Sequence, residues 1–282
     1  MSFLETVGLG AIAGLTIYLG LPLGRLRRVD DRLRVALAMF SVGILAFIFM
    51  DVSAHGEQIL SAALNRYKSH HGSLGHVFAL FALTCAAVLL GTGGIASAET
   101  WLRARVRRQP TIAGGAVDVV AAGAELDADV IRRRALRAGM TIGVAIGLHN
   151  FAEGLAIGVS ARSGAIGLAT VLIVGFAMHN ASEGFGIVGP LAGVRPSWRW
   201  LFAAGLVAGG PTFLGSIIGY QVHSDPLELA FYGLAGGAIL YVIGEVWGAM
   251  RRHGHRLLGL YLLALGFLVG VGTDLIVSYG GG

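Results

Sequence analysis

The sequence contains little charge and almost no cysteine. Charged residues make up 13% of its 282 residues, against the share of about 25% that is usual for soluble domains. Hydrophobic residues make up 55% and the mean hydropathy is +0.73, which excludes an ordinary soluble domain and predicts a polytopic membrane protein. The single cysteine, Cys85, excludes a disulfide within the chain and a zinc site built from several thiolates.

Other signals are also missing. No nucleotide-binding motif is present, which argues against a self-contained ATP-driven pump. The net charge of +5 does not indicate nucleic acid as a partner, because the arginines lie in short connections between apolar runs, where they orient a membrane protein. The first apolar run lacks a basic segment ahead of it and a cleavage signature, so we expect a retained helix there and not a signal peptide.

Eight apolar runs are long enough to cross a bilayer, which takes roughly 20 residues. A single all-α transmembrane domain of eight spans is therefore predicted. The expected spans are 3–23, 34–54, 74–101, 137–160, 165–190, 198–220, 227–249 and 257–279. The only long connection, 102–131, is basic at both ends and rich in alanine and glycine in its middle, and we expect a mobile cytoplasmic loop with a short helix leading into the fourth span.

The basic residues predict the orientation of these spans. All but three of the 21 lysines and arginines fall in connections on one side; the exceptions are Arg66, Lys68 and Arg162. Because cytoplasmic connections carry the excess of Lys and Arg, both termini are predicted outside the cytoplasm, in a multi-pass protein of the cell membrane. The lipid bilayer is then a partner along the whole bundle.

One six-residue phrase occurs twice, as His-Asn-Phe-Ala-Glu-Gly and His-Asn-Ala-Ser-Glu-Gly, each time inside an apolar run. Its polar residues are His149, Asn150, Glu153, His179, Asn180 and Glu183. On a helix, residues i and i+4 share one face, so the histidine and the glutamate of each copy are expected side by side. Ionisable residues deep in a membrane are costly and usually mark a pathway for an ion, a proton or a substrate.

The two copies are predicted to converge on one metal site. Spans four and five are joined by a short loop and run antiparallel, which suggests a pseudo-twofold axis in the membrane plane. Imidazole and carboxylate groups suit Zn²⁺ and other first-row divalent ions, and the lack of thiolates argues against copper(I). One copy alone could equally be a packed, hydrogen-bonded pair, but two copies at matched depth favour a site.

Glycines occur along both spans that carry the motif, and we expect them to let these two backbones approach closely. They are Gly143, Gly147, Gly154 and Gly158 in span four, and Gly175, Gly184, Gly186 and Gly189 in span five. Such glycine-rich faces are also compatible with a homodimer.

The paired motifs resemble the signature of the ZIP (Zrt/Irt-like) family of divalent-metal transporters. The fourth span of that family carries His-Asn-x-x-Glu/Asp-Gly, and its fifth carries a His- or Gln-led motif that ends in Glu-Gly. The resemblance implies eight spans with both termini outside, a long cytoplasmic connection between spans three and four, and a 3+2+3 bundle whose outer triplets are inverted repeats. It also implies that helices carrying the ion move against a static group.

The resemblance implies a ligand set for the transported ion, with no catalytic cofactor. The primary ligands would be His149, Glu153 and Glu183. His179 would complete the shell, and Asn150 and Asn180 would stand where the family bridges to, or holds, a second ion.

The chain departs from the family pattern in two places. Many members have a glutamate before a proline in span six, whereas Gly210 precedes Pro211 here. Asn180 stands where some relatives have an aspartate. With only two carboxylates in the cluster, we expect one occupied metal site and not two.

Three further acidic residues are candidates for the pathway: Asp51 near the external entrance, and Glu99 and Glu245 near the cytoplasmic exit. Interfacial solvation explains Asp51 equally well, and the two glutamates could instead pair with loop arginines. The predicted function is inward transport of Zn²⁺ or a similar divalent ion, without enzymatic activity. An intramembrane metal-dependent hydrolase is the main alternative, because a zinc-bound cluster could activate water; an ion channel is another.

Overall fold

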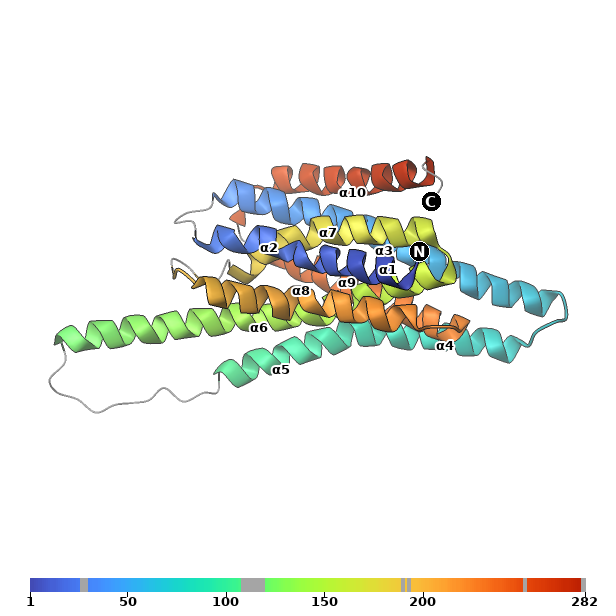
Figure 1. Cartoon of the computed structure of the whole chain (residues 1–282), viewed down its shortest axis with the longest axis horizontal. Helices are drawn as coiled ribbons and strands as arrows, with labels where there is room; N and C mark the ends of the chain where they lie inside the picture. Colours follow the sequence, from blue (N-terminus) through green and yellow to red (C-terminus); the bar gives the residue numbers. More distant parts are fainter. Residues whose placement is uncertain (26–29, 108–119, 189–190, 192–193, 251–252, 280–282) are drawn as a thin grey trace.

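The structure is a bundle of long helices. The computed structural model describes residues 1–25, 30–107, 120–188, 191, 194–250 and 253–279, and every regular element in these ranges is helical. Figure 1 shows the helices lying alongside one another in a single bundle. In chain order they are α1 (Phe3–Leu15), α2 (Ile17–Gly20), η1 (Leu21–Arg25), α3 (Asp31–Lys68), α4 (Leu74–Leu89), η2 (Leu90–Gly94), α5 (Ile95–Arg107), α6 (Val120–Ser163), α7 (Ile166–Val188), α8 (Trp198–Tyr220), α9 (Asp225–Met250) and α10 (Arg256–Tyr279).

Eight helical segments account for the predicted spans. Seven of them are long and apolar enough to cross a membrane: Phe3–Leu23, Asp31–Lys68, Leu74–Trp101, Ala135–Ser163, Trp198–Tyr220, Asp225–Gly248 and Arg256–Ile276. α7 is the eighth, with a shorter apolar stretch, Ile166–Ala181, because its second half carries the polar residues of the motif. The prediction of an all-α polytopic membrane protein is confirmed.

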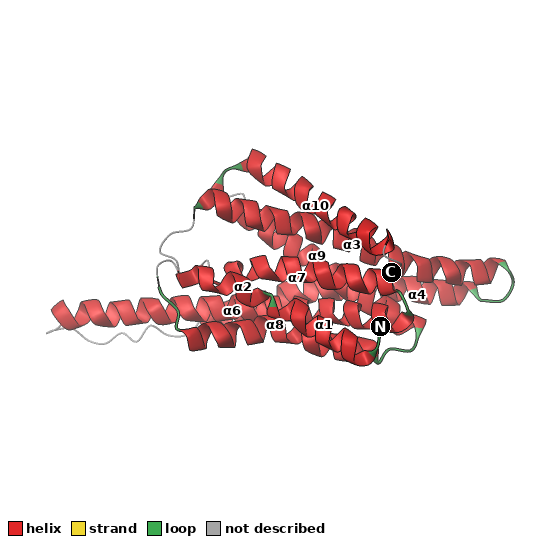
Figure 2. Cartoon of the chain, turned by 45° about the horizontal axis from the view of Figure 1, so that its top comes forward, coloured by secondary structure: helices red, strands yellow, loops and turns green. Residues whose placement is uncertain are grey.

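Two helices extend further than the sequence predicted. α3 continues to Lys68 although its span was expected to end at 54, and α6 begins at Val120, ahead of the expected start at 137. The end of α3 packs on α4 and α9 through Ala63, Leu80 and Leu229, and this apolar contact keeps the segment helical where a connection was expected. Figure 2 shows α3 and α4 projecting together from one end of the bundle and α6 projecting from the other.

The predicted loop over 102–131 is helical at both ends, because α5 continues to Arg107 and α6 begins at Val120. The predicted short helix before span four is therefore part of one long helix. Residues 108–119, on which the predicted mobility falls, lie outside the described residues.

The two ends of the chain lie at the same end of the bundle. In Figure 1, α1 begins and α10 ends near the side from which α3 and α4 project, whereas α5 ends and α6 begins toward the opposite side. This placement requires an even number of crossings, in agreement with eight spans.

Helices α1 and α8 cross at a pair of glycines. A Cβ on Gly14 would collide with the carbonyl oxygen of Gly209, and a Cβ on Gly209 would collide with that of Gly14. Each backbone therefore occupies the space that a side chain of the other would need. Such contacts between small residues let membrane helices approach closely.

Two other crossings repeat one geometry. Gly43 of α3 meets Gly266 of α10, and Gly91 of η2 meets Gly237 of α9. In both crossings, a Cβ on either glycine would collide with the carbonyl oxygen of the residue three positions before the other glycine. An inverted repeat would exchange spans one, two and three with spans six, seven and eight, in that order. Under this exchange, the crossing of spans two and eight corresponds to the crossing of spans seven and three, and the α1–α8 crossing of spans one and six corresponds to itself. The glycine pairs thus support the predicted 3+2+3 inverted repeat.

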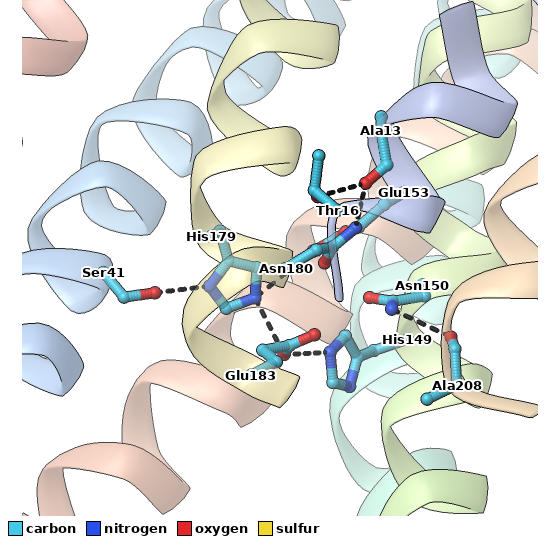
Figure 3. Close-up of polar contacts among 10 residues, drawn as sticks. All are labelled: Ala13, Thr16, Ser41, His149, Asn150, Glu153, His179, Asn180, Glu183 and Ala208. Carbon is cyan, nitrogen blue, oxygen red and sulfur yellow. Dashed lines mark hydrogen bonds and ion pairs between the residues drawn. The ribbon is translucent and has the colours of Figure 1, made fainter. Parts of the chain in front are cut away.

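Gly154, Gly158 and Gly184 pack differently from the prediction, and Gly189 lies outside the described residues. Gly154 and Gly158 of α6 lie against carbonyl groups of α8, and Gly184 of α7 lies against that of Ile17 in α2. α6 and α7 do not meet through these glycines, because the imidazole and carboxylate side chains of the motif occupy the space between the two helices (Figure 3). The glycine faces instead bind each of these helices to a different neighbour.

Adjacent glycines in α8 allow a matched test of this packing. Gly209→Ala is expected to destabilise the protein by about 1–3 kcal/mol, the usual cost of inserting atoms into a tightly packed contact, because its Cβ meets backbone. Gly210→Ala is expected to be neutral or stabilising by up to about 1 kcal/mol, since its Cβ would meet only the Leu206 side chain at 3.5 Å. Thermal unfolding of the purified protein in detergent measures both. Equal melting temperatures for the two variants would contradict the proposed role of Gly209.

Candidate metal centre

The six polar residues of the repeated phrase lie together in the core of the bundle. α6 supplies His149, Asn150 and Glu153, and α7 supplies His179, Asn180 and Glu183; none is more than 8% exposed. Both helices are apolar on either side of the phrase, so burial of their apolar residues carries these polar groups inward. Figure 3 shows side chains from both helices turned toward a common region.

Glu183 is the shared partner of both histidines. Its Oε1 lies 2.6 Å from Nε2 of His149 and 2.8 Å from Nε2 of His179. The sequence predicted pairing within each copy of the phrase; this occurs for His179 with Glu183, whereas His149 reaches across to the other helix (Figure 3). The cross-helix contact arises because α6 and α7 face each other along this polar edge.

Glu153 lies at the side of the same cluster. Its Oε1 is 3.9 Å from Nε2 of His179, and neither of its carboxylate oxygens has a hydrogen-bond partner among the described residues. The residue is completely buried. A buried carboxylate without a partner is costly, and a bound cation would offset that cost.

The two asparagines play equivalent parts in the two halves. Nδ2 of Asn150 donates to the carbonyl oxygen of Ala208 in α8 at 3.0 Å, and Nδ2 of Asn180 donates to that of Ala13 in α1 at 3.1 Å. The amide oxygen of each asparagine is buried without a hydrogen-bond partner among the described residues. Each side chain is thus held by its nitrogen, which leaves its oxygen available as a ligand.

The first span is interrupted next to this contact. α1 ends at Leu15 and α2 begins at Ile17, and the hydroxyl of Thr16 donates to the carbonyl oxygen of Ala13 at 2.6 Å. The Ala13 carbonyl therefore accepts from both Thr16 and Asn180 (Figure 3). The sequence predicted one continuous helix and gave no sign of this break.

Ser41 is a site residue that the sequence reasoning missed. It is 4% exposed in α3, and its Oγ lies 2.6 Å from Nδ1 of His179. The imidazole of His179 therefore lies between a hydroxyl on one side and carboxylates on the other (Figure 3). The signal was a serine in the middle of the apolar run of the second span.

The arrangement has the chemistry of a divalent-metal site. One ligand atom from each of His149, His179 and Glu183 lies within 4.8 Å of the others. Zinc binds nitrogen and carboxylate oxygen at about 2.0–2.2 Å, so ligands on one ion lie up to about 4 Å apart, and small side-chain movements would close this set around a single ion. Glu153 borders the set and can supply a second carboxylate.

The structure does not bring the three pathway candidates into this centre. Asp51 is half-buried near the middle of α3, with Oδ1 3.7 Å from Nδ1 of His55. Glu99 is buried in α5, and Glu245 is exposed in α9. Their roles in ion passage stay predictions.

The sixth span contributes backbone and no carboxylate next to the site. Gly210 and Pro211 lie in the middle of α8, and the nearby carbonyl of Ala208 accepts from Asn150. Glu153 and Glu183 are therefore the carboxylates of the described cluster, and the expectation of one bound ion stays a prediction.

The fold and the centre define a polytopic α-helical membrane protein with a buried cluster of metal-binding side chains. The family model described as "ZIP Zinc transporter" matches residues 121–273, more than half of the chain, so the chain belongs to the ZIP zinc transporter family. It is also similar to the protein named "Zinc transporter ZupT" of Clostridium perfringens (strain 13 / Type A), with 27% identity over 147 residues.

That match covers 50% of this chain and 51% of the relative, so the two align over about half of their lengths. The matched family residues include both copies of the repeated phrase. The resemblance that the motifs indicated is confirmed at the level of the family, and metal-ion transport across a membrane is the activity of that family.

Proposed function

We propose that this protein carries Zn²⁺, or a similar divalent ion, through a site formed by α6 and α7. The observation that carries the proposal is the single oxygen of Glu183 shared by two histidines from antiparallel helices. The proposed ligands are His149, Glu153, His179 and Glu183, with Asn150 and Asn180 beside them. An entering ion would replace the hydrogen bond between His149 and Glu183 and the contact between His179 and Glu183.

The charge of the site favours one divalent ion. Glu153 and Glu183 together neutralise a charge of +2, so the loaded site is neutral overall. A neutral site avoids the large cost of a net charge in a low-dielectric interior. A second divalent ion would leave an excess charge of +2 that no described carboxylate of the cluster balances.

Alternating access is the proposed mechanism, and the packing indicates which helices move together. We assign α1, α2, α6, α7 and α8 to one set and α3, α4, α5, α9 and α10 to the other, because the most extensive helix contacts, such as α6 with α8 and α3 with α10, fall within one set. Wherever a Cβ added to a described glycine would collide with the backbone of another helix, the glycine and that helix belong to the same set. Between the sets, Gly175 of α7 meets only side-chain atoms of Ile48 and Ile44 in α3.

Because close backbone contacts occur within each set and side-chain contacts occur between the sets, one set could slide past the other. Backbone-to-backbone crossings lock helices together, whereas apolar side chains between the sets can repack. The ligands belong to the first set, so movement of this set would carry the site from one side of the membrane to the other. Because cytoplasmic connections carry the excess of Lys and Arg, we propose that the ends of α5 and α6 face the cytoplasm and that transport is inward, driven by the ion gradient and the membrane potential.

Uptake into proteoliposomes tests the proposal against the alternatives. The purified protein is expected to give saturable ⁶⁵Zn²⁺ uptake, and Glu153→Ala is expected to reduce it to the level of empty vesicles, since the alanine removes one of the two neutralising carboxylates. Non-saturable flux would favour a channel. Cleavage of lipid or peptide without uptake would favour the hydrolase and would contradict transport.

A further inference from the structure

Ser41 joins the metal centre to the other set of helices. It belongs to α3, whereas all six residues of the repeated phrase lie on α6 and α7. Its Oγ is 2.6 Å from Nδ1 of His179, and both residues are buried. The contact therefore crosses the surface at which the two sets of helices are proposed to slide.

The two histidines are not equivalent in this respect. Nδ1 of His149 is buried without a hydrogen-bond partner among the described residues, whereas Nδ1 of His179 contacts Ser41. The inverted repeat explains the difference. Gly43 and Gly237 play the same part in the two halves, and Ala235 lies two residues before Gly237 as Ser41 lies two residues before Gly43. At the equivalent position the chain thus has a methyl group in place of a hydroxyl.

A hydroxyl at this position controls the tautomer of the ring. A histidine that binds metal through Nε2 carries its proton on Nδ1, and a partner for that N–H fixes the ring orientation and raises ligand basicity. Ser41 can accept this hydrogen bond, because a serine hydroxyl both donates and accepts. When no ion is bound and the proton of His179 is on Nε2, which lies 2.8 Å from Oε1 of Glu183, the same hydroxyl can donate to Nδ1 instead.

We propose that Ser41 is a positioning residue that strengthens metal binding by His179 only while α3 packs against this part of α7. The proposal rests on the proposed transport function. When the ligand-bearing helices move past α3, His179 leaves Ser41 and loses the partner of its Nδ1–H. Metal affinity is then lower in the displaced state, which favours release of the ion there.

Equilibrium Zn²⁺ binding to the detergent-purified full chain tests this role. Ser41→Ala is expected to weaken binding about 10–100-fold, the usual cost of removing a partner of a metal-bound histidine. Alanine favours helix more than serine does, so the variant is expected to fold. Ser216→Ala is the matched control, because Ser216 is equally buried in α8 but donates only to the Phe213 carbonyl of its own helix; its affinity is expected to stay unchanged.

A double-mutant cycle separates positioning from general packing. In a His179→Ala background, Ser41→Ala is expected to cause no further loss of affinity, because its effect passes through the missing ring. An additional loss of the same 10–100-fold in that background would overturn the proposal. So would unchanged Zn²⁺ affinity in Ser41→Ala alone, or an equal loss in Ser216→Ala.

Glu183→Gln distinguishes failure of this proposal from failure of the proposed site. If Glu183→Gln abolishes Zn²⁺ binding but Ser41→Ala does not weaken it, the site is supported and the role of Ser41 is rejected. If Glu183→Gln binds Zn²⁺ like the unaltered chain, both proposals are rejected. The apparent KM of uptake, expected to rise in Ser41→Ala by the same factor as the loss of affinity, provides a second measurement.

Discussion

Replacing Glu183 by glutamine is expected to abolish saturable Zn²⁺ uptake and to weaken Zn²⁺ binding by more than about 100-fold, since even outer partners of metal ligands cost about 10–100-fold. The carboxylate has two functions in the described cluster. It places Nε2 of both histidines around one oxygen, and in the proposed site it would supply half of the negative charge that neutralises a divalent ion. Glutamine keeps the volume and loses the charge.

The matched control is Glu57→Gln. Glu57 is an exposed glutamate on the projecting part of α3, hydrogen-bonded to the hydroxyl of Ser61. Its substitution is expected to leave the rate and the apparent KM of uptake unchanged. Binding and uptake are measured on the same preparation, after the melting temperature shows that both variants are folded. Normal saturable uptake by the Glu183→Gln variant would exclude Glu183 as a ligand of the transported ion.

The sequence located the candidate centre but not its contacts. The spacing of His149 and Glu153, repeated at His179 and Glu183, placed four ligand-type side chains on two helix faces near the middle of their spans. A helical period defines the face on which a side chain lies, but it does not define the rotation of one helix relative to its neighbour. For that reason, the contact between His149 and Glu183 could not be predicted from the spacing alone.

The glycines show the same limit more clearly. Their presence in spans four and five correctly indicated close helix packing, but the partner was assigned by proximity along the chain. In the structure, Gly154 packs on α8 and Gly184 on α2. Both partners are equivalent under the inverted repeat, so the symmetry inferred from the two motifs could have assigned them, if it had been applied to all eight spans.

Residues that act through a single long-range contact were the hardest to find. Ser41 stands 138 positions before His179, and nothing in its own span resembles the repeated phrase. The Ala13 carbonyl next to the break at Thr16 likewise accepts from Asn180 in a distant helix. Local periodicity carries no information about such pairs, because each is defined only when the helices are packed.

A cross-link between the two sets of helices is expected to block transport. The chain has one cysteine, so Cys85→Ser gives a cysteine-free background. In that background, Ile48→Cys with Gly175→Cys joins α3 to α7 at a point where a Cβ on Gly175 would lie 2.6 Å from Cδ1 of Ile48. Closing this pair with a short thiol-reactive linker is expected to reduce Zn²⁺ uptake to background, and reduction of a cleavable linker is expected to restore it.

The control pair lies within one set. Gly56→Cys with Leu229→Cys joins α3 to α9, where a Cβ on Gly56 would lie 3.5 Å from Cδ1 of Leu229. Each pair combines a glycine with a large aliphatic residue, so the expected packing costs are similar. The linked control is expected to transport at the rate of its unlinked form, because the proposed movement leaves α3 and α9 fixed relative to each other. Transport that survives the α3–α7 link, or is lost equally with the α3–α9 link, would show that the ion crosses without relative movement of these two sets.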